Sequence, residues 1–282
     1  MRHHQRHHLR HHLRLRRTVV AVACLATATV GLTACGSESG KASEAGKASE
    51  TGKASAAGKT KEDKPKEPFA GMSGTEIVDK AVEATKGATS LRLVGDIKDD
   101  ETGRMKMDLA LDTSGKCAGT MTMGGEGTFD LIVPGDSTVY VKYDEKFLRA
   151  QSKGQPENET ALAVQMLANR WSKTKASGAD AKDIAGMCDL DDLLKEFEGE
   201  INSNARRGAT TTLDGTPAIK IDAHDSEEKY TIYVATEGKP YLLKIVDAGA
   251  AEPEHIAFSE YDKPVKTTPP TGKVIDLDEL GA

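Results

Sequence analysis

Apolar side chains follow two different spacings along this chain, and each spacing predicts a different kind of secondary structure. Between Ile77 and Thr85 the apolar positions recur every three or four residues, which is typical of a helix with one buried face. Ser73 to Glu76 form a capping box before it, and Gly87 supplies a C-terminal stop. We therefore expect the folded part of the chain to open with a helix between Ser73 and Gly87.

After residue 90 the spacing changes to two. Apolar and polar residues alternate, and turn residues such as Ser114-Gly115 and Pro134-Gly135 separate the alternating runs. This alternation predicts an antiparallel meander with one dry and one wet face. Five strands are expected, at residues 91–97, 105–111, 117–123, 129–133 and 139–143.

The second half of the chain predicts helices and then more strands. Helical spacing covers residues 160–169 and 189–198. Strands are expected at 210–213, 218–223, 230–235, 241–246 and 255–261, followed by a proline-rich tail along the surface at 263–271. A twisted sheet of about ten strands tends to curl. The predicted fold class is α+β, a large curved antiparallel sheet (half-barrel) with helices covering the concave face.

The first 34 residues predict a lipoprotein signal peptide. Residues 1–17 are rich in arginine and histidine, and residues 18–31 are apolar but too few to span a bilayer. Leu32-Thr33-Ala34-Cys35 then matches the bacterial lipobox, in which the thiol of Cys35 takes a diacylglycerol anchor. The prediction is an exported protein held by Cys35 at the outer face of the cytoplasmic membrane. The alternatives are an ordinary cleavage site and, from Arg16-Arg17, twin-arginine export.

Residues 35–71 predict a disordered tether, and a folded domain is expected at residues 72–282. A Gly-Lys-Ala-Ser unit recurs three times between residues 40 and 57, and from residue 36 on no apolar side chain larger than alanine, prolines aside, precedes Phe69. Such a segment cannot offset its ordering entropy by burial.

Net charge narrows the expected partners. The leader holds six of the 38 lysines and arginines and none of the 44 acidic residues, so the chain from Cys35 on has a formal net charge of −12. This charge argues against binding to nucleic acid or to a bare anionic membrane surface. Contact with the membrane is therefore expected through the lipid anchor.

Cys117 and Cys188 are the other cysteines that follow the leader. Outside the membrane two cysteines usually pair, so we expect a disulfide between the third strand and the start of the 189–198 helix. Two free thiols are the alternative.

No residue pattern predicts an enzyme, a cofactor or a metal site. The sequence has no G-x-S-x-G, P-loop, CxxC or H-E-x-x-H motif, and only His224 and His255 follow the leader. Asp189, Asp191 and Asp192 could attract a cation, but their place at a helix start favours capping.

Two C-terminal segments carry a resemblance to a known family. They are Val-Ala-Thr-Glu-Gly-Lys-Pro-Tyr-Leu-Leu at 234–243 and Phe-Ser-Glu-Tyr-Asp-Lys-Pro-Val at 258–265. With the lipobox and the tether, they resemble actinobacterial lipoproteins of the LppX/LprG type, which are similar in fold to the LolA/LolB carriers. The resemblance covers roughly residues 72–267. It implies a curved sheet whose helices enclose an apolar cavity for the acyl chains of a lipid or glycolipid.

The apolar stripes themselves allow two interpretations. Spacing alone favours an ordinary core, whereas adaptable methionines would suit a cavity for lipid tails. The helix positions expected to line such a cavity are Leu162, Met166, Leu167, Leu193, Leu194 and Phe197. The leading hypothesis is a non-enzymatic lipoprotein that shields acyl chains during transfer across the envelope. The alternative is a tethered interaction or sensory module that meets an envelope protein partner and has no cavity.

Overall fold

The computed structural model describes residues 67–99, 103–176, 179–195, 204–224, 229–247, 249 and 252–280. The predicted signal peptide, Cys35 and most of the predicted tether lie outside these residues.

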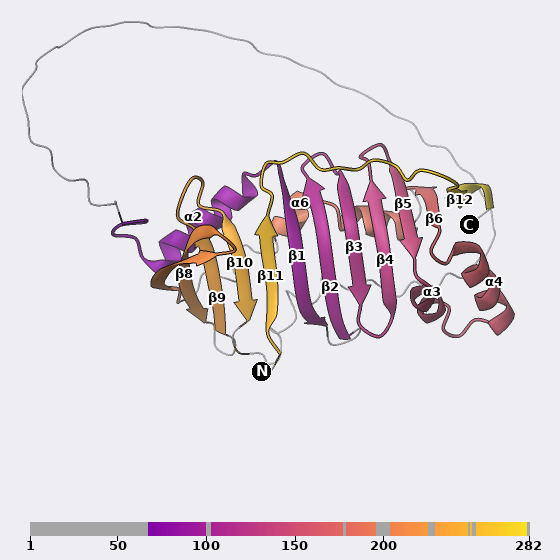
Figure 1. Cartoon of the computed structure of the whole chain (residues 1–282), viewed down its shortest axis with the longest axis horizontal. Helices are drawn as coiled ribbons and strands as arrows, with labels where there is room; N and C mark the ends of the chain where they lie inside the picture. The colour runs from indigo at the N-terminus through magenta and orange to yellow at the C-terminus, as the bar shows by residue number, and fades with distance from the viewer. Residues whose placement is uncertain are drawn as a thin grey trace, which may run out of the picture. The chain divides into compact units, whose positions relative to one another are not determined.

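The described residues form one open sheet of twelve strands (Figure 1). Its order is β12-β6-β5-β4-β3-β2-β1-β11-β10-β9-β8-β7, so two meanders lie side by side and meet where β1 pairs with β11. All neighbouring strands are antiparallel except β12 and β6. The strands are β1 (Ser90–Asp99), β2 (Gly103–Asp112), β3 (Cys117–Met123), β4 (Gly127–Val133), β5 (Thr138–Tyr143), β6 (Trp171–Lys175), β7 (Arg206–Leu213), β8 (Thr216–His224), β9 (Lys229–Ala235), β10 (Leu242–Asp247), β11 (Glu254–Ser259) and β12 (Ile275–Asp276).

Helices lie behind this sheet in Figure 1 and pack on one of its faces. The helices are α2 (Gly74–Lys86), α3 (Glu145–Gln151), α4 (Glu157–Leu167), α5 (Ala179–Gly186), α6 (Leu190–Lys195) and the short η1 (Asp278–Leu280). Helix α2 packs on β7 to β10 and α5 on β5, whereas α3 and α4 contact each other beside the end of β4. The predicted α+β class and the curved open sheet are confirmed.

The capping box starts α2 as predicted. The Ser73 N–H donates to the Glu76 carboxylate at 2.7 Å, and the Glu76 N–H donates to Ser73 Oγ at 3.3 Å. Ile77 and Val78 are fully buried on the face that meets the sheet. A Cβ on Gly74 would lie 2.5 Å from the Ala205 carbonyl oxygen, so this position requires glycine.

Several elements differ from those predicted. The helix expected at 160–169 runs instead from Glu157 to Leu167, and the one expected at 189–198 begins one residue later and is described as far as Lys195. Helices α3 and α5 and strand β12 were not predicted as elements, because each is too short to show a period. A strand was expected to start at Trp171, and β6 does begin there, although it buries only Ser172.

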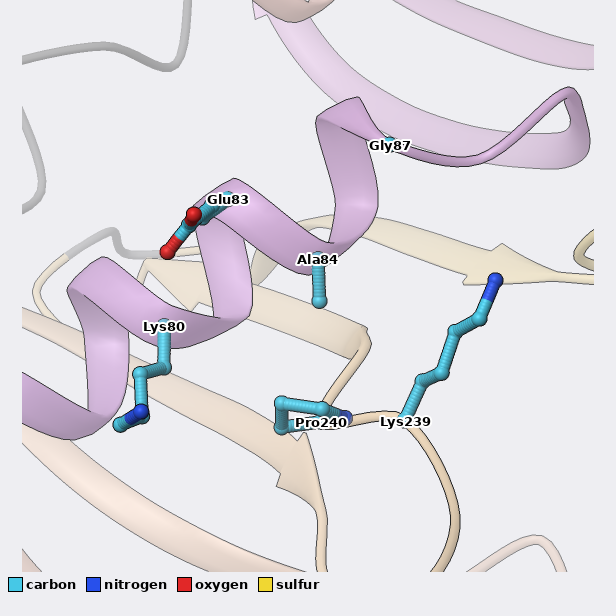
Figure 2. Close-up of a pocket in the computed structure, with 6 residues that line it drawn as sticks. All are labelled: Lys80, Glu83, Ala84, Gly87, Lys239 and Pro240. Atoms are coloured by element: carbon cyan, nitrogen blue, oxygen red, sulfur yellow. The ribbon is translucent and has the colours of Figure 1, made fainter. Parts of the chain in front are cut away.

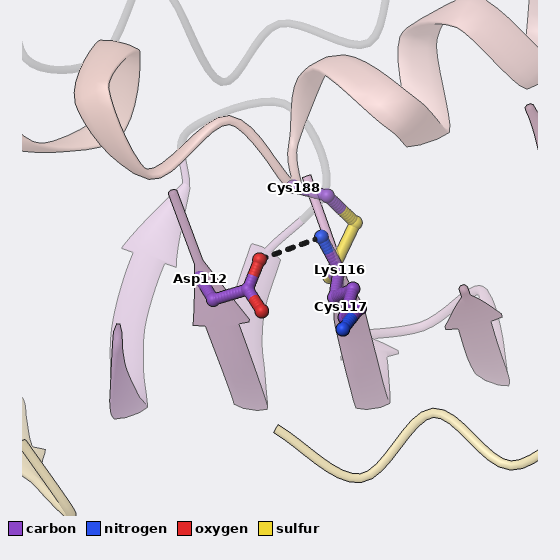
Figure 3. Close-up of a disulfide and its surroundings, with 4 residues drawn as sticks. All are labelled: Asp112, Lys116, Cys117 and Cys188. Carbon is purple, nitrogen blue, oxygen red and sulfur yellow. Dashed lines mark hydrogen bonds between the residues drawn. A yellow bond between two sulfur atoms is a disulfide. The ribbon is translucent and has the colours of Figure 1, made fainter. Parts of the chain in front are cut away.

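A disulfide joins Cys117, the first residue of β3, to Cys188, just before α6 (Figure 3). The two Cα atoms are 5.4 Å apart and both residues are buried. Asp112 holds the preceding turn, because its carboxylate accepts from the N–H groups of Ser114 at 2.8 Å and Lys116 at 3.0 Å. The covalent link therefore fixes the start of α6 to the sheet, as the sequence predicts.

A carboxylate clasp closes the seam between the two meanders. Asp262, which follows β11, accepts hydrogen bonds from the Thr89 N–H at 2.9 Å, the Tyr241 hydroxyl at 2.6 Å and the Lys239 ammonium at 3.0 Å. The Tyr241 and Tyr261 rings stack with centroids 3.9 Å apart. Hydrogen bonds from Tyr241, then from the Thr89 backbone and Lys239, hold the pKa of Asp262 far below its ordinary value.

Reduction of the disulfide should destabilise the domain. The Cys117–Cys188 bond closes 71 residues, and a loop of this size stabilises by about 4 kcal/mol in the chain-entropy model. Urea unfolding of the chain with and without reductant measures the loss, and the double variant C117S/C188S should not respond to reductant. Equal stability of the oxidised and reduced chains would contradict this role.

Replacing Asp262 should weaken the clasp in a pH-dependent way. Asn suits the positive φ of 57° at this position, so Asp262→Asn changes mainly the charge and should cost about 1–2 kcal/mol at pH 7. A depressed carboxyl pKa stabilises the fold above the unfolded value of about 4, and this stabilisation is lost as the pH falls toward the folded pKa. Unfolding curves of wild type and D262N should therefore converge in acid.

The exposed Glu237, in the turn before Lys239, provides the control for this measurement. Glu237→Gln should leave stability unchanged at pH 7 and at pH 3, because the side chain is exposed. A constant difference between wild type and D262N from pH 7 down to pH 3, well below the unfolded value of about 4, would show that the carboxylate charge does not matter.

Candidate functional site

The inner face of the sheet changes in character from one end to the other. At the disulfide end, the register row Leu91, Leu111, Cys117 and Val133 presents aliphatic side chains beside the bonded cysteine. These side chains are 0–4% exposed. Branched and aliphatic residues of this kind make a well-defined, rigid core.

The opposite end of the inner face is formed by methionines. Met105 pairs with Met123 and Met107 pairs with Met121, so four methionines from β2 and β3 form one patch, called here the methionine patch. Their exposed fractions are between 1% and 7%. Methionine is unbranched and polarisable, so this patch can repack around contents of different shape.

A glycine makes room for the methionine patch. Gly95 on β1 pairs with Met107, and a Cβ placed on Gly95 would lie 2.8 Å from Met107 Cγ. The missing side chain leaves a depression in the sheet, and Met107 fills it. A flexible side chain in such a depression is the part of a core that moves most easily.

Aromatic rings border the methionine patch. Phe129 pairs with Met121 across β3 and β4, and its ring lies 5.2 Å from Phe147 of α3. Tyr143 stacks on Phe147 at 5.1 Å. Asp144 caps α3 by accepting from the Phe147 N–H at 2.6 Å, which sets the helix against this end of the sheet.

The helix residues expected to line a cavity do not come together. Leu162 on α4 is 55% exposed, and Met166 and Leu167 on the same helix are half-buried away from the core cluster. On α6, Leu194 is buried in the core and Leu193 packs against it. Phe197 lies outside the described residues. The apolar end of the inner face comes instead from strand methionines, which the period-two alternation had already marked as inward.

An open groove lies between α2 and the turn from β9 to β10 (Figure 2). Its volume is about 360 Å³, and it is lined by Lys80, Glu83, Ala84, Gly87, Lys239 and Pro240. Figure 2 shows Ala84 and Pro240 facing each other across it. Charged side chains border this groove on both sides, so it does not suit a hydrocarbon chain.

The acidic residues near Cys188 cap a helix. Asp189 accepts a hydrogen bond from the Asp192 N–H at 2.9 Å, and Asp192 pairs with Lys195 at 2.5 Å. In the described ranges, no group of three histidine, cysteine or acidic side chains is arranged to hold a metal ion. No helix within the same ranges combines the length and hydrophobicity needed to cross a membrane.

No family model matches the sequence, and no curated protein matches it. Among solved structures, the chain is similar to LprF from Mycobacterium bovis, with 14% identity, a TM-score of 0.48 and coverage of 71% of this chain and 97% of LprF. It is also similar to the Mycobacterium tuberculosis lipoprotein LppX, with 15% identity, a TM-score of 0.43 and coverage of 69% and 97%. A LolA superfamily protein from Nitrosomonas europaea matches at 10% identity and a TM-score of 0.22, covering 69% and 95%. LppX, a member of the group that the sequence resembles, is thus among the structures to which this chain is similar, and the similarity is one of fold alone.

Proposed function

We propose that this chain is an extracytoplasmic lipoprotein, anchored through Cys35, that binds the acyl chains of a membrane lipid or glycolipid. The binding place is the methionine patch on the inner face of the sheet, under the layer of helices. The chain would act as a binder or carrier and not as an enzyme. The sequence resemblance to LppX/LprG-type lipoproteins and the curved open sheet support the proposal.

The methionine patch is the observation on which the proposal depends. Four neighbouring methionines pair across β2 and β3, over the depression left by Gly95. A rigid core would favour branched side chains at these positions, whereas adaptable methionines suit a surface that must accept chains of varied length. The disulfide holds α6 at the other end of the sheet, so the methionine end can open without loss of the fold.

A second candidate function follows from the burial of the methionine patch. Met105, Met107, Met121 and Met123 are at most 7% exposed, so the inner face is covered as it stands. A domain whose interior stays closed would serve as a tethered module that displays its surface to an envelope protein. The two functions differ in whether lipid enters the interior.

The test is lipid capture by the delipidated, refolded chain. Native mass spectrometry after incubation with an envelope lipid extract should show bound lipid. Met107→Phe with Met121→Phe keeps the face apolar but replaces flexible side chains with larger, rigid rings. We expect this double variant to hold less than about half of the lipid bound by wild type, because the patch can no longer repack.

The control variant introduces phenylalanine on the outer face of β3, the strand that carries Met121 on its inner face. Ala118 of β3 pairs with Ala110 and Ile132 on the outer face, so Ala118→Phe adds a ring away from the interior. This variant should bind lipid like wild type. Absence of lipid from wild type, or equal capture by the inner-face and outer-face variants, would favour the interaction module instead.

A further inference from the structure

The outer face of the sheet has a charge opposite to that of the rest of the domain. Across the twelve strands, outward positions carry eleven lysines and arginines against six aspartates, a net charge of +5. From residue 67 on, the chain has 25 lysines and arginines and 39 acidic residues, a net charge of −14. The remainder of this region therefore carries −19. The acidic net charge of the whole chain hides a basic face.

Ion pairs neutralise most aspartates of this face and leave several lysines without a carboxylate. Asp96 pairs with Arg104 at 2.5 Å. Asp108 pairs with Arg92, and Asp130 pairs with Lys142. Lys175 and Lys244, on β6 and β10, have no ion-pair partner among the described residues. Asp112 and Asp222 also have no ion pair among the described residues, but they are outnumbered, so the unpaired charge on this face is mainly positive.

Aromatic rings lie among the lysines of the outer face. Lys142 lies over the ring of Trp171 at 5.2 Å, and Lys220 lies over that of Tyr233 at 5.8 Å. Trp171 is near one end of the sheet and Tyr233 near the other, each in register with a lysine of the neighbouring strand. Tryptophan and tyrosine favour the boundary between lipid head groups and hydrocarbon, and lysine favours anionic head groups.

The helices pack on the other side of the sheet, and on the outer face Figure 1 shows only the C-terminal segment after β11, which runs along one end of the strands. The sheet and the core layer separate the acidic residues of the helices from the outer face. Among acidic residues outside the strands, Glu252 reaches this face and pairs with Arg104 at 2.7 Å. Charges separated by more than the Debye length of about 8 Å at physiological ionic strength are largely screened. A surface that approaches the outer face therefore meets the positive field of the lysines.

We propose that the outer face of the sheet is a docking surface for an anionic lipid bilayer. Charge complementarity and the interfacial aromatic residues on the same face select this occupant. Docking holds the domain flat on the leaflet, with the helices pointing away from it. The inference goes beyond acyl-chain binding and does not depend on it, because docking uses the opposite face of the sheet.

Trp171 provides the readout, because it is the only tryptophan of the chain. The experiment uses the chain from residue 35 on with Cys35→Ser, which keeps every described residue and removes the anchoring thiol. With vesicles that contain about a third phosphatidylglycerol, Trp171 emission should shift to the blue and the protein should sediment with the vesicles. Vesicles of pure phosphatidylcholine should produce neither effect. High salt should reverse the binding.

Two charge-matched triple variants locate the contact. K175E/K220E/K244E reverses three outer-face lysines and should weaken vesicle binding by at least about tenfold. K80E/K146E/K182E reverses three exposed lysines on α2, α3 and α5 and should bind like wild type. The milder K175Q/K220Q/K244Q should bind with intermediate strength, and circular dichroism checks that each variant is folded.

Three results of the vesicle experiments would overturn the proposal. They are no response of Trp171 to anionic vesicles, equal binding to neutral vesicles, and equal losses in the two reversed variants. Capture of the chain on polyglutamate beads without vesicle binding would assign the face to an acidic protein partner and would also overturn it. Lipid capture in the interior is measured separately, so failure of one proposal leaves the other standing.

Discussion

The pairing of β1 with β11 is the constraint on which the rest of the structure depends. It joins two meanders into one sheet, and the register Leu93↔Phe258 and Val94↔Ala257 continues the alternation of inward and outward side chains from one meander to the next. A slip of one residue at this seam would reverse every side chain of one half. The Asp262 clasp and the stacked Tyr241 and Tyr261 lie at the same seam. One register therefore gathers the methionines on the inner face and the lysines on the outer face.

Local patterns predicted the elements well wherever a period was long enough to see. Strand β3 has the predicted bounds, the capping box starts α2, and Cys117 bonds to Cys188. The β1–β11 pairing could not be read in the same way, because residues 93 and 258 are brought together by the order of strands and not by local spacing. Likewise, β6 is flanked by β5 and β12 and needs few apolar residues, so its sequence shows little alternation.

The expected lining residues illustrate a second limit of spacing. Leu162 and Met166 have helical spacing, but α4 packs against α3 beside the sheet, so their spacing carries no information about the inner face. The inward methionines follow the period-two alternation, but this local pattern does not distinguish a patch that can repack around a ligand from an ordinary core. The basic outer face was hidden for another reason. Net charge sums over both faces, and only the register shows that lysines such as Lys220 and Lys244 share one side.

The two proposals assign a separate role to each face of the sheet. As proposed, the outer face would meet the leaflet, and the inner face would take acyl chains under the helices. The central claim is the entry of lipid at the methionine patch, and methyl NMR of the chain labelled in its methionines tests it most directly. The account predicts that added lipid shifts the signals of Met105, Met107, Met121 and Met123 and leaves Met166 of α4 unchanged. Unchanged signals from all four patch methionines in the presence of bound lipid would contradict it.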